Sequence, residues 1–207
     1  MRTFALLTLN RTDEAKSRLS SILSPDERKQ LVILMAKDIL DSLVEIDTII
    51  ISREDLKSEF KEYKHEFILQ RDKGLTNAVE TANIAAIKKG ADATIFLPGD
   101  VPLINKKIIN NIISYGEDHK VIISPGKRNG IGMVYRRPPD IIKTVFTNQS
   151  LVDILHKTSN TEENVFIYSC PNLYTDIDIP ADIEDFLKMG KGKRTFEYLS
   201  SKLEKIL

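Results

Sequence analysis

Three acidic residues are the first candidates for chemistry. Asp100 directly follows an apolar run over residues 93–97, and Asp176 and Asp178 stand two residues apart in the segment TDIDIP. A carboxylate at the end of a buried strand must be hydrated, paired or bound to a cation, and alternate residues of an extended segment point to the same face. Carboxylates gathered at one edge would repel each other unless a cation joined them. Oxygen ligands without a nearby histidine or thiol suit magnesium rather than zinc.

A simpler role is open to the same acids. Asp100 could cap the helix that follows it, and Asp178 could cap the helix that opens at Pro180, since aspartate is a common N-cap before proline. Either role is reasonable for one residue taken alone. The occurrence of all three acids together favours a Mg²⁺ site formed by Asp100, Asp176 and Asp178.

A basic segment follows the first apolar run. Lys16 and Arg18, with Arg11, could donate hydrogen bonds to phosphates. The segment lacks the glycines and the GK[ST] ending of a Walker loop. A charge cluster of this size also suits an ordinary solvated surface, so both interpretations stay open.

Two glycine-bearing segments could approach a ligand. Asn77, which follows Gly74, could hold the polar edge of a ligand, although Thr76 or Asn77 could simply cap the next helix. Gly130 and Gly132 allow the backbone to approach a ligand closely, but a hairpin turn would also explain them.

Apolar runs and helical patterns alternate along most of the chain. The strand-like runs cover 3–9, 48–52, 66–69, 93–97, 120–124, 133–136 and 165–169, and the helical patterns cover 25–44, 55–62, 76–89, 106–115, 150–157, 181–189 and 194–207. Such alternation predicts an α/β fold with a mostly parallel twisted sheet and helices on both faces. Ligands of such sheets bind beyond the carboxyl ends of the strands. We therefore expect Asp100 and the basic segment to meet at this edge.

The helix predicted over 25–44 has a clear start, because Ser24 and Glu27 form a capping box around Pro25. Its apolar residues cover more than one stripe, which indicates burial on two sides. A subunit contact in a homodimer is the alternative. We expect one domain over 1–207, in which residues 125–170 form a small inserted lobe after the regular alternation breaks.

Composition limits the classes of function. The chain has 207 residues, with 30 Lys and Arg balanced by 30 Asp and Glu, which argues against nucleic-acid and membrane partners. The single cysteine excludes an intramolecular disulfide framework and suits a reducing compartment. No signal peptide or membrane span is visible, so a cytoplasmic protein is expected.

Several of these motifs occur together, and in the same order, in a known family. The strings EAKSRL, LSPDER, GLTNAV, LPGDVPLI, GIGM and TDIDIPADI resemble the CofC/FbiD family of 2-phospho-L-lactate (or phosphoenolpyruvate) guanylyltransferases of coenzyme F-420 biosynthesis. The resemblance spans nearly the whole chain. It implies a magnesium-dependent enzyme with a GT-A-like nucleotidyltransferase fold, in which GTP reacts with a small phosphorylated acid and pyrophosphate leaves.

The resemblance also implies roles for single residues. Lys16 and Asp100 are expected to be catalytic, and Asp100, Asp176 and Asp178 to bind the metal. The expected nucleotide-binding residues are Leu9, Asn10, Lys16, Arg18, Gly74, Asn77, Pro98 and Gly99, and the expected acceptor-binding residues are Gly132, Met133 and Ser150.

The chain departs from the family pattern at three places. The family commonly has a lysine at Asn10, a threonine at Met133, and a histidine closer to the serine than His156 is to Ser150. These departures bear on how the acceptor is held. The alternatives are another nucleotidyltransferase of the same fold, of the sugar-phosphate or molybdopterin type, and a nucleotide-binding regulatory module without turnover.

Overall fold

The structure is a computed structural model that describes residues 1–12, 15–143, 145–147, 149–159 and 165–203. Its described strands form one sheet in the order β3-β2-β1-β4-β6-β5-β7. Strand β6 runs antiparallel to both neighbours, and the other pairings are parallel. The predicted mostly parallel sheet is therefore confirmed. The strands are β1 (Thr3–Leu9), β2 (Asp47–Ser52), β3 (Glu66–Leu69), β4 (Ala93–Pro98), β5 (Val121–Pro125), β6 (Ile131–Arg136) and β7 (Val165–Ile167).

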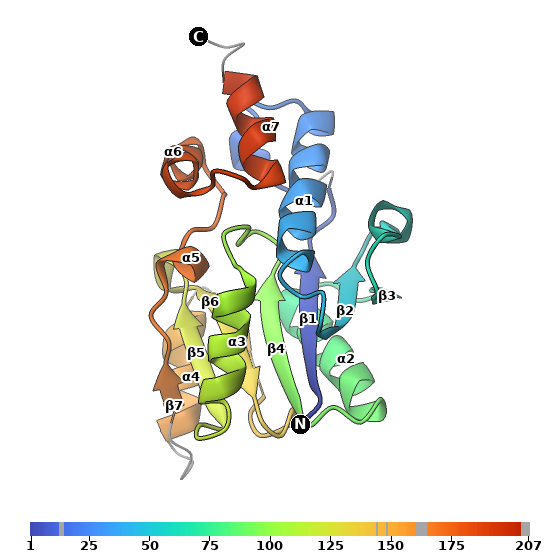
Figure 1. Ribbon diagram of the computed structural model, residues 1–207, viewed down its shortest axis with the longest axis vertical. Coiled ribbons are helices and arrows are strands. Elements are labelled where there is room, and N and C mark those ends of the chain that lie inside the picture. Colours follow the sequence, from blue (N-terminus) through green and yellow to red (C-terminus); the bar gives the residue numbers. More distant parts are fainter. Residues whose placement is uncertain (13–14, 144, 148, 160–164, 204–207) are drawn as a thin grey trace.

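Helices cover both faces of this sheet (Figure 1). Helices α1 and α3 pack on one face, and α2 and α4 pack on the other. The described helices are α1 (Pro25–Leu40), α2 (Leu75–Lys88), α3 (Lys106–Tyr115), α4 (Ser150–Ser159), α5 (Pro171–Tyr174), α6 (Pro180–Met189) and α7 (Arg194–Leu203). None of the helices in the described ranges combines the length and the apolar character that a bilayer crossing requires.

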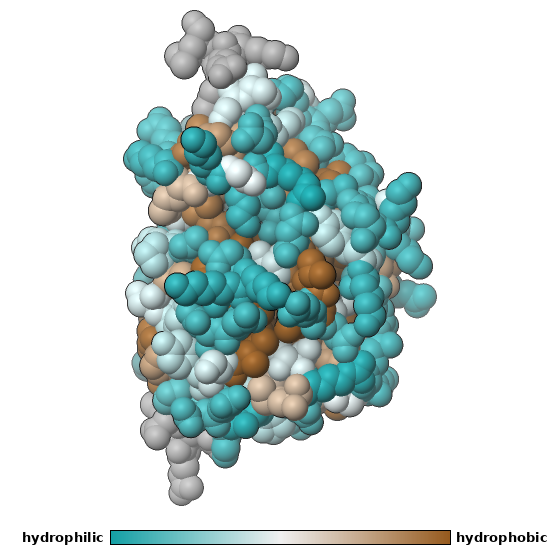
Figure 2. Space-filling model, in the orientation of Figure 1, coloured by the Kyte–Doolittle hydropathy of each residue, from teal (hydrophilic) through white to brown (hydrophobic). Residues whose placement is uncertain are grey.

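Strand β1 shows why the central strands are apolar throughout. Ala5 and Leu7 pack into the cluster under α1 and α3, whereas Phe4 and Leu6 pack into the cluster under α2. A strand covered on both faces must be apolar at every position, not only at alternate ones. The outer surfaces of the helices are polar, and Figure 2 shows mainly hydrophilic side chains on the face in view, with hydrophobic ones between them.

Helix α1 starts as predicted but ends earlier. The Ser24 hydroxyl accepts from Glu27 N at 3.4 Å, and the Glu27 carboxylate accepts from Ser24 N at 2.9 Å. The helix ends at Leu40, not at residue 44. Beyond it, Leu43 N donates to Leu40 O in a tighter turn while its side chain stays buried, so the apolar pattern continues past the helix.

Burial on two sides of α1 is confirmed. Ile33 and Ala36 pack toward the sheet, whereas Leu31 and Met35 pack in a separate cluster with residues of α6 and α7. Figure 1 shows α7 lying beside α1 above the sheet. The apolar residues on both sides of α1 thus pack within one chain.

The structure differs locally from the predictions at three places. The helix predicted over 55–62 is a single 3-10 turn over Lys57–Phe60, and the short helix α5 was not predicted. Residues 125–170 contribute two strands to the same sheet, since β6 lies between β4 and β5 and β7 pairs with β5. The turn between β5 and β6, a 3-10 turn over Lys127–Asn129, is thereby placed beside the segment that joins α5 to α6.

Candidate active site

The site begins where two parallel strands end side by side. Thr8 of β1 is paired with Pro98 of β4, so the chain leaves both strands at the same edge. A Cβ at Gly99 would lie 2.6 Å from Leu9 Cδ2 and 2.7 Å from Thr8 O. Glycine is therefore needed there, because the backbone of one strand end rests on the other. Asp100 follows immediately.

Lys16 joins two of the three predicted acids. Its Nζ donates to Asp100 Oδ2 at 2.9 Å and to Asp178 Oδ1 at 2.6 Å, and its side chain is only 5% exposed. Burial alone would lower the Lys16 pKa, but the charges of both carboxylates outweigh it and raise the pKa above its ordinary value. Lys16 is therefore a buried cation fixed by residues from two distant parts of the chain.

A second group of ion pairs lies beside the first. Arg128 Nη1 lies 3.5 Å from both Asp176 Oδ2 and Asp178 Oδ2, and its Nη2 lies 3.0 Å from Asp182 Oδ2. Lys127 Nζ lies 2.7 Å from Asp182 Oδ1. The 3-10 turn after β5 is thus tied to the start of α6 by two cations.

Asp182 is the anchor of this second group. It is nearly fully buried and accepts from the backbone N of Asp178 and of Ile179 at 2.9 and 3.0 Å. Burial alone would raise the Asp182 pKa, but the hydrogen bonds from Lys127, from these two amides and from Arg128 lower it to about 2. Asp182 therefore fixes the backbone that carries Asp178.

Asp176 is the least satisfied of the acids. Its Oδ1 is buried without a hydrogen-bond partner. Burial and then the charges of Asp100, Asp178 and Asp182 raise the pKa of Asp176 to about 6, against the opposing charge of Arg128. Buried carboxylates that repel each other and leave one oxygen unpaired favour the approach of another cation.

The acids have donor groups suited to a divalent cation. Among the described residues, no three His, Cys, Asp or Glu side chains stand together as a finished ligand set, and Lys16 and Arg128 lie between the three carboxylates. The donors are carboxylate oxygens, which Mg²⁺ prefers, and Asp176 Oδ1 is unpaired. The residues therefore fit such an ion by their chemistry, provided that it shares the carboxylates with these two cations.

The alternative role of Asp100 and Asp178 as helix caps is wrong. Helix α3 is capped by Asn105, whose Oδ1 accepts from Ile108 N at 3.0 Å. The N-cap of α6 is Ile179, and Asp182 supplies the side-chain acceptor there. Neither Asp100 nor Asp178 is used by a helix terminus, so both remain for the site.

Three adjoining pockets open at this edge of the sheet. The central pocket, of about 490 Å³, is lined by Leu9, Lys16, Leu75, Pro98, Gly99 and Asp100, among others. The loop pocket, of about 800 Å³, shares Leu9 and Lys16 and adds Arg53, Gln70, Gly74 and Asp178. The turn pocket, of about 890 Å³, shares Leu75, Pro98 and Asp100 and adds Lys127, Gly132, Thr147, Ser150 and Asp176. Each acid thus faces a pocket, and Asp100 lies where two of them meet.

Most of the predicted site residues line these pockets. Those on the central or loop pocket are Leu9, Asn10, Lys16, Gly74, Pro98, Gly99, Asp100 and Asp178, and those on the turn pocket are Asp100, Gly132, Ser150 and Asp176. Three predicted residues do not line them. Arg18 is exposed, Asn77 Nδ2 donates to Lys73 O at 2.9 Å, and the Met133 side chain is buried in the core under α1 and α3.

Two of the pocket residues have other local tasks. The Ser150 hydroxyl donates to Thr147 O at 2.6 Å and accepts from Thr147 N at 2.8 Å. A Cβ at Gly132 would lie 2.2 Å from Leu173 O, so glycine is required by packing against α5. Both residues shape the wall of the turn pocket.

The start of α2 lacks a side-chain cap. Its N-cap is Gly74, with φ 103°, which answers the open question about Thr76 and Asn77. The Thr76 hydroxyl instead accepts from Phe146 N at 2.9 Å. The first backbone N–H groups of α2 therefore border the loop and central pockets without a side-chain partner, and such groups favour anions.

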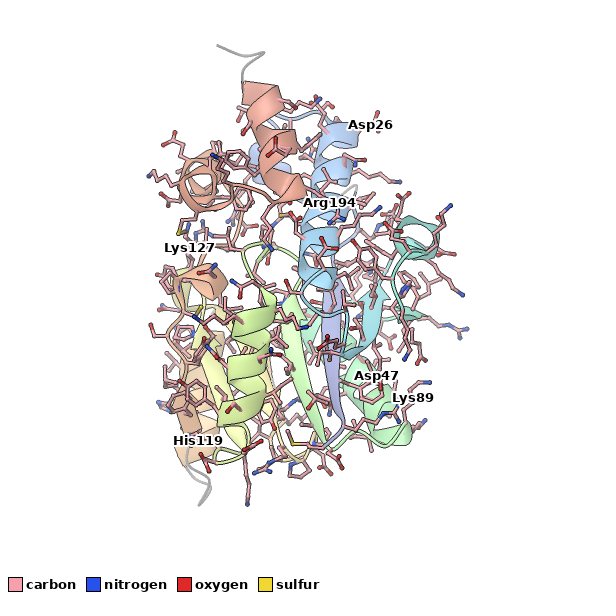
Figure 3. The ribbon with its side chains drawn as sticks, in the orientation of Figure 1. Asp26, Asp47, Lys89, His119, Lys127 and Arg194 are labelled. Carbon is pink, nitrogen blue, oxygen red and sulfur yellow. The ribbon has the colours of Figure 1, made fainter. Side chains whose placement is uncertain are left out.

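Sequence reasoning missed the ion-paired turn. Lys127, Arg128 and Asp182 were not singled out, although the basic pair in PGKRNG and the third acid of DIDIPAD were visible. Figure 3 shows Lys127 on the side of the molecule where α5 and α6 lie. The only signal was the charge complementarity of the two segments, which are about 50 residues apart in the chain.

The family model described as "Guanylyl transferase CofC like" matches residues 3–204. The chain belongs to the CofC-like guanylyl transferase family. One relative is a 2-phospho-L-lactate guanylyltransferase from Methanocaldococcus vulcanius. It is 31% identical to this chain over 198 residues, which cover 95% of this chain and 89% of the relative. Another from Ferroglobus placidus is 32% identical over 186 residues, covering 90% and 86%.

Solved structures show the same fold at lower identity. A protein from Desulfovibrio desulfuricans G20, described as a nucleotide-diphospho-sugar transferase, superposes with a TM-score of 0.82 at 18% identity and covers 97% of this chain and 95% of its own. The protein Rv0371c from Mycobacterium tuberculosis, solved in complex with manganese, superposes with a TM-score of 0.56 at 14% identity, covering 90% and 97%. At these identities the likeness concerns the fold alone.

Proposed function

We propose that this chain is a guanylyltransferase that joins GTP and 2-phospho-L-lactate to give lactyl-diphospho-guanosine and pyrophosphate, in the biosynthesis of coenzyme F-420. One observation carries the proposal. Lys16 binds Asp100 and Asp178 at the point where the central, loop and turn pockets adjoin. The relatives named 2-phospho-L-lactate guanylyltransferase support the choice of substrates.

The pockets suggest how the two substrates lie. The nucleotide fits the central and loop pockets, which have Lys16, Arg11 and the uncapped start of α2 for its phosphates. The acceptor fits the turn pocket, beside Ser150 and Gly132. Asp100 borders both, so the reacting phosphates meet next to it.

In this arrangement an oxygen of the acceptor phosphate attacks the α-phosphorus of GTP. A new P–O bond forms, the bond between the α-phosphorus and the bridging oxygen breaks, and pyrophosphate leaves with the electron pair. The acceptor phosphate is already an anion near neutral pH, so no general base is needed. Catalysis then consists of positioning and charge neutralisation, and the buried Lys16 supplies positive charge to the phosphates.

We further propose that the enzyme depends on Mg²⁺, held by Asp100, Asp176 and Asp178. A bound divalent ion supplies charge neutralisation at the phosphates. The unpaired Asp176 Oδ1 supports this assignment, as does the absence of histidine and thiol among the donors.

We place the enzyme in the cytoplasm, because its single cysteine suits a reducing compartment.

The test is a matrix of substrates. Purified protein is given each of four nucleoside triphosphates with 2-phospho-L-lactate, phosphoenolpyruvate or 3-phosphoglycerate, and pyrophosphate release is followed with Mg²⁺ and with a chelator. We expect release with GTP and 2-phospho-L-lactate, loss on chelation and recovery when Mg²⁺ is restored. A sugar phosphate is offered as a fourth acceptor, and release with it alone would support the sugar-nucleotide alternative. No release in any pairing, with nucleotide still bound, would support the regulatory module.

A further inference from the structure

Lys127 of the turn pocket has no place in the reaction described above. The central and turn pockets share Leu75, Pro98 and Asp100, so the reacting phosphate of the acceptor lies at that shared end. The part of the acceptor that does not react must then contact residues that line the turn pocket alone. Among the described residues of that part, Lys127 is the single cation.

The two side-chain hydroxyl groups of this wall, those of Thr147 and Ser150, are engaged. The Ser150 hydroxyl donates to Thr147 O and accepts from Thr147 N. The Thr147 hydroxyl donates to the Asp153 carboxylate. A carboxylate placed there needs a charged or N–H donor, because an unpaired carboxylate is costly to bury. The Lys127 ammonium has three donor hydrogens, and its hydrogen bond to Asp182 uses one.

Lys127 is also held in place before any ligand arrives. Its side chain is 16% exposed, and its Nζ lies 2.7 Å from Asp182 Oδ1. Asp182 is in turn fixed by the backbone N of Asp178 and of Ile179. A free lysine loses considerable rotamer freedom when it binds a ligand, whereas a lysine held in advance loses less.

Arg128, the neighbouring cation, is placed differently. It reaches Asp176, Asp178 and Asp182 and is not among the residues that line the turn pocket. It neutralises the acids, whereas Lys127 borders the space for the acceptor. The two consecutive basic residues therefore have separate tasks.

We infer that Lys127 is a specificity-determining residue that binds the carboxylate of the acceptor and selects phosphorylated acids over phosphorylated alcohols. The inference rests on the proposed function, because it assigns one end of the acceptor in that reaction. It explains how a pocket bordered by Asp100 and Asp176 accepts a ligand that carries two anionic groups. A sugar phosphate, with hydroxyl groups in place of the carboxylate, gains less from an ammonium there, because a hydroxyl oxygen carries no charge to pair with it.

The experiment compares two acceptors of similar shape. One is 2-phospho-L-lactate, and the other is propane-1,2-diol 2-phosphate, in which CH₂OH replaces the carboxylate. We expect the wild-type protein to have at least a 10-fold higher kcat/KM for the acid. In Lys127→Met, we expect kcat/KM for the acid to fall about 10- to 150-fold, the loss of one charged hydrogen bond, and kcat/KM for the alcohol and KM for GTP to change less than about 3-fold.

The matched control is Lys188→Met. Lys188 pairs with Asp185, the same acid that Lys127 approaches at 3.6 Å, but its side chain is exposed and lies outside the turn pocket. This variant removes the same charge beside α6 and should leave both acceptors unchanged. Lys127→Arg, which keeps a cation, should restore part of the preference for the acid.

Three outcomes would overturn the inference. They are equal use of both acceptors by the wild-type protein, equal losses of kcat/KM for both acceptors in Lys127→Met, and an unchanged kcat/KM for the acid in that variant. The wild-type comparison of the two acceptors does not depend on the folding of any variant. Lys127→Gln serves as a second variant if Lys127→Met does not fold. If the wild-type protein transfers to no phosphorylated acid, the proposed function itself has failed, which is a distinct result.

Discussion

The central and loop pockets rest on the ends of two hydrogen-bonded parallel strands, whereas the turn pocket rests on a turn held by ion pairs. In the first region, β1 and β4 fix Gly99 and Asp100 through their shared register. In the second region, Lys127 and Arg128 hold the turn against Asp182. The first region is fixed by the sheet itself, and the second by side chains that meet from distant segments.

This difference indicates in which region a substitution should change activity without changing the stability of the fold. Strand ends are held by backbone hydrogen bonds, so a side chain placed on them can be changed without moving its neighbours. The turn is held by side chains and close packing, so a change there disturbs both the shape of the pocket and the stability of the fold. The following predictions test this contrast from the largest expected effect to the smallest.

Asp100→Asn should have the largest effect on turnover. The amide keeps the shape of the side chain but loses the charge that pairs with Lys16 and that would hold the proposed metal, so turnover should fall about 100- to 1000-fold, as for the removal of one group that stabilises the transition state. Pyrophosphate release measures the loss, and circular dichroism should show an unchanged fold. Asp118→Asn, at an exposed residue after α3, is the control. Wild-type rates in Asp100→Asn would contradict the site.

Lys16→Met should have the second largest effect, and this effect should be on the use of GTP. One buried cation that donates to charged groups is removed, which lowers kcat/KM for GTP about 10- to 150-fold, and KM for the acceptor should change less. Kinetics with GTP varied at a saturating acceptor measure this. Lys106→Met, which removes an exposed lysine paired with Glu45, should be silent. Unchanged kinetics in Lys16→Met would return the basic segment to a structural role.

Gly132→Ala should act on stability and on the acceptor. The new Cβ would lie 2.2 Å from Leu173 O, and overpacking of this kind costs about 1–3 kcal/mol, or a fall of roughly 2–12 °C in Tm for a chain of this size. KM for the acceptor should rise more than KM for GTP. Gly192→Ala, with no atom within 4 Å of its Cβ but with φ 88°, is the contrasting variant, because it adds backbone strain without overpacking, whereas Gly132 is not at positive φ. Equal Tm values in the wild type and Gly132→Ala would show that α5 can shift away from the new Cβ without a loss of stability.

Glu54→Gln should have the smallest effect. It weakens the contact between Glu54 and Thr12, which precedes Lys16 in the chain. Glu54 Oε2 accepts from Thr12 N at 3.0 Å and from Thr12 Oγ1 at 2.7 Å. Weakening this tether by about 1 kcal/mol should raise KM for GTP roughly 5-fold, with KM for the acceptor unchanged. Glu62→Gln, at a surface pair with Lys37, is the matched control. An equal rise in KM for both substrates would indicate a general loss of order instead.

Residue types alone predicted the first region well. The apolar runs 3–9 and 93–97 could only be buried strands, and their parallel pairing places Lys16 and Asp100 at one edge whatever the order of the remaining strands. The alternation within TDIDIP was also read correctly, since Ile177 is buried between two acids that both reach Arg128. Pro98 and Gly99, which were expected from the family resemblance, lie at the same strand ends.

The second region was predicted only in part, and Met133 shows why. Its side chain points into the core because β6 lies inside the sheet, between β4 and β5, and is buried on both faces. The position of β6 in the strand order could not be read from the residues of β6 itself.

The sequence by itself determined the α/β architecture, the capped start of α1 and the meeting of Asp100 with the basic segment at the ends of β1 and β4, because periodicity, capping and strand polarity are local properties of the chain. The tertiary structure decided that β6 runs antiparallel between β4 and β5 and that Lys127 and Arg128 meet Asp182. Strand order and ion pairing join segments far apart in the chain. They depend on the packing of the whole sheet, which no single segment encodes.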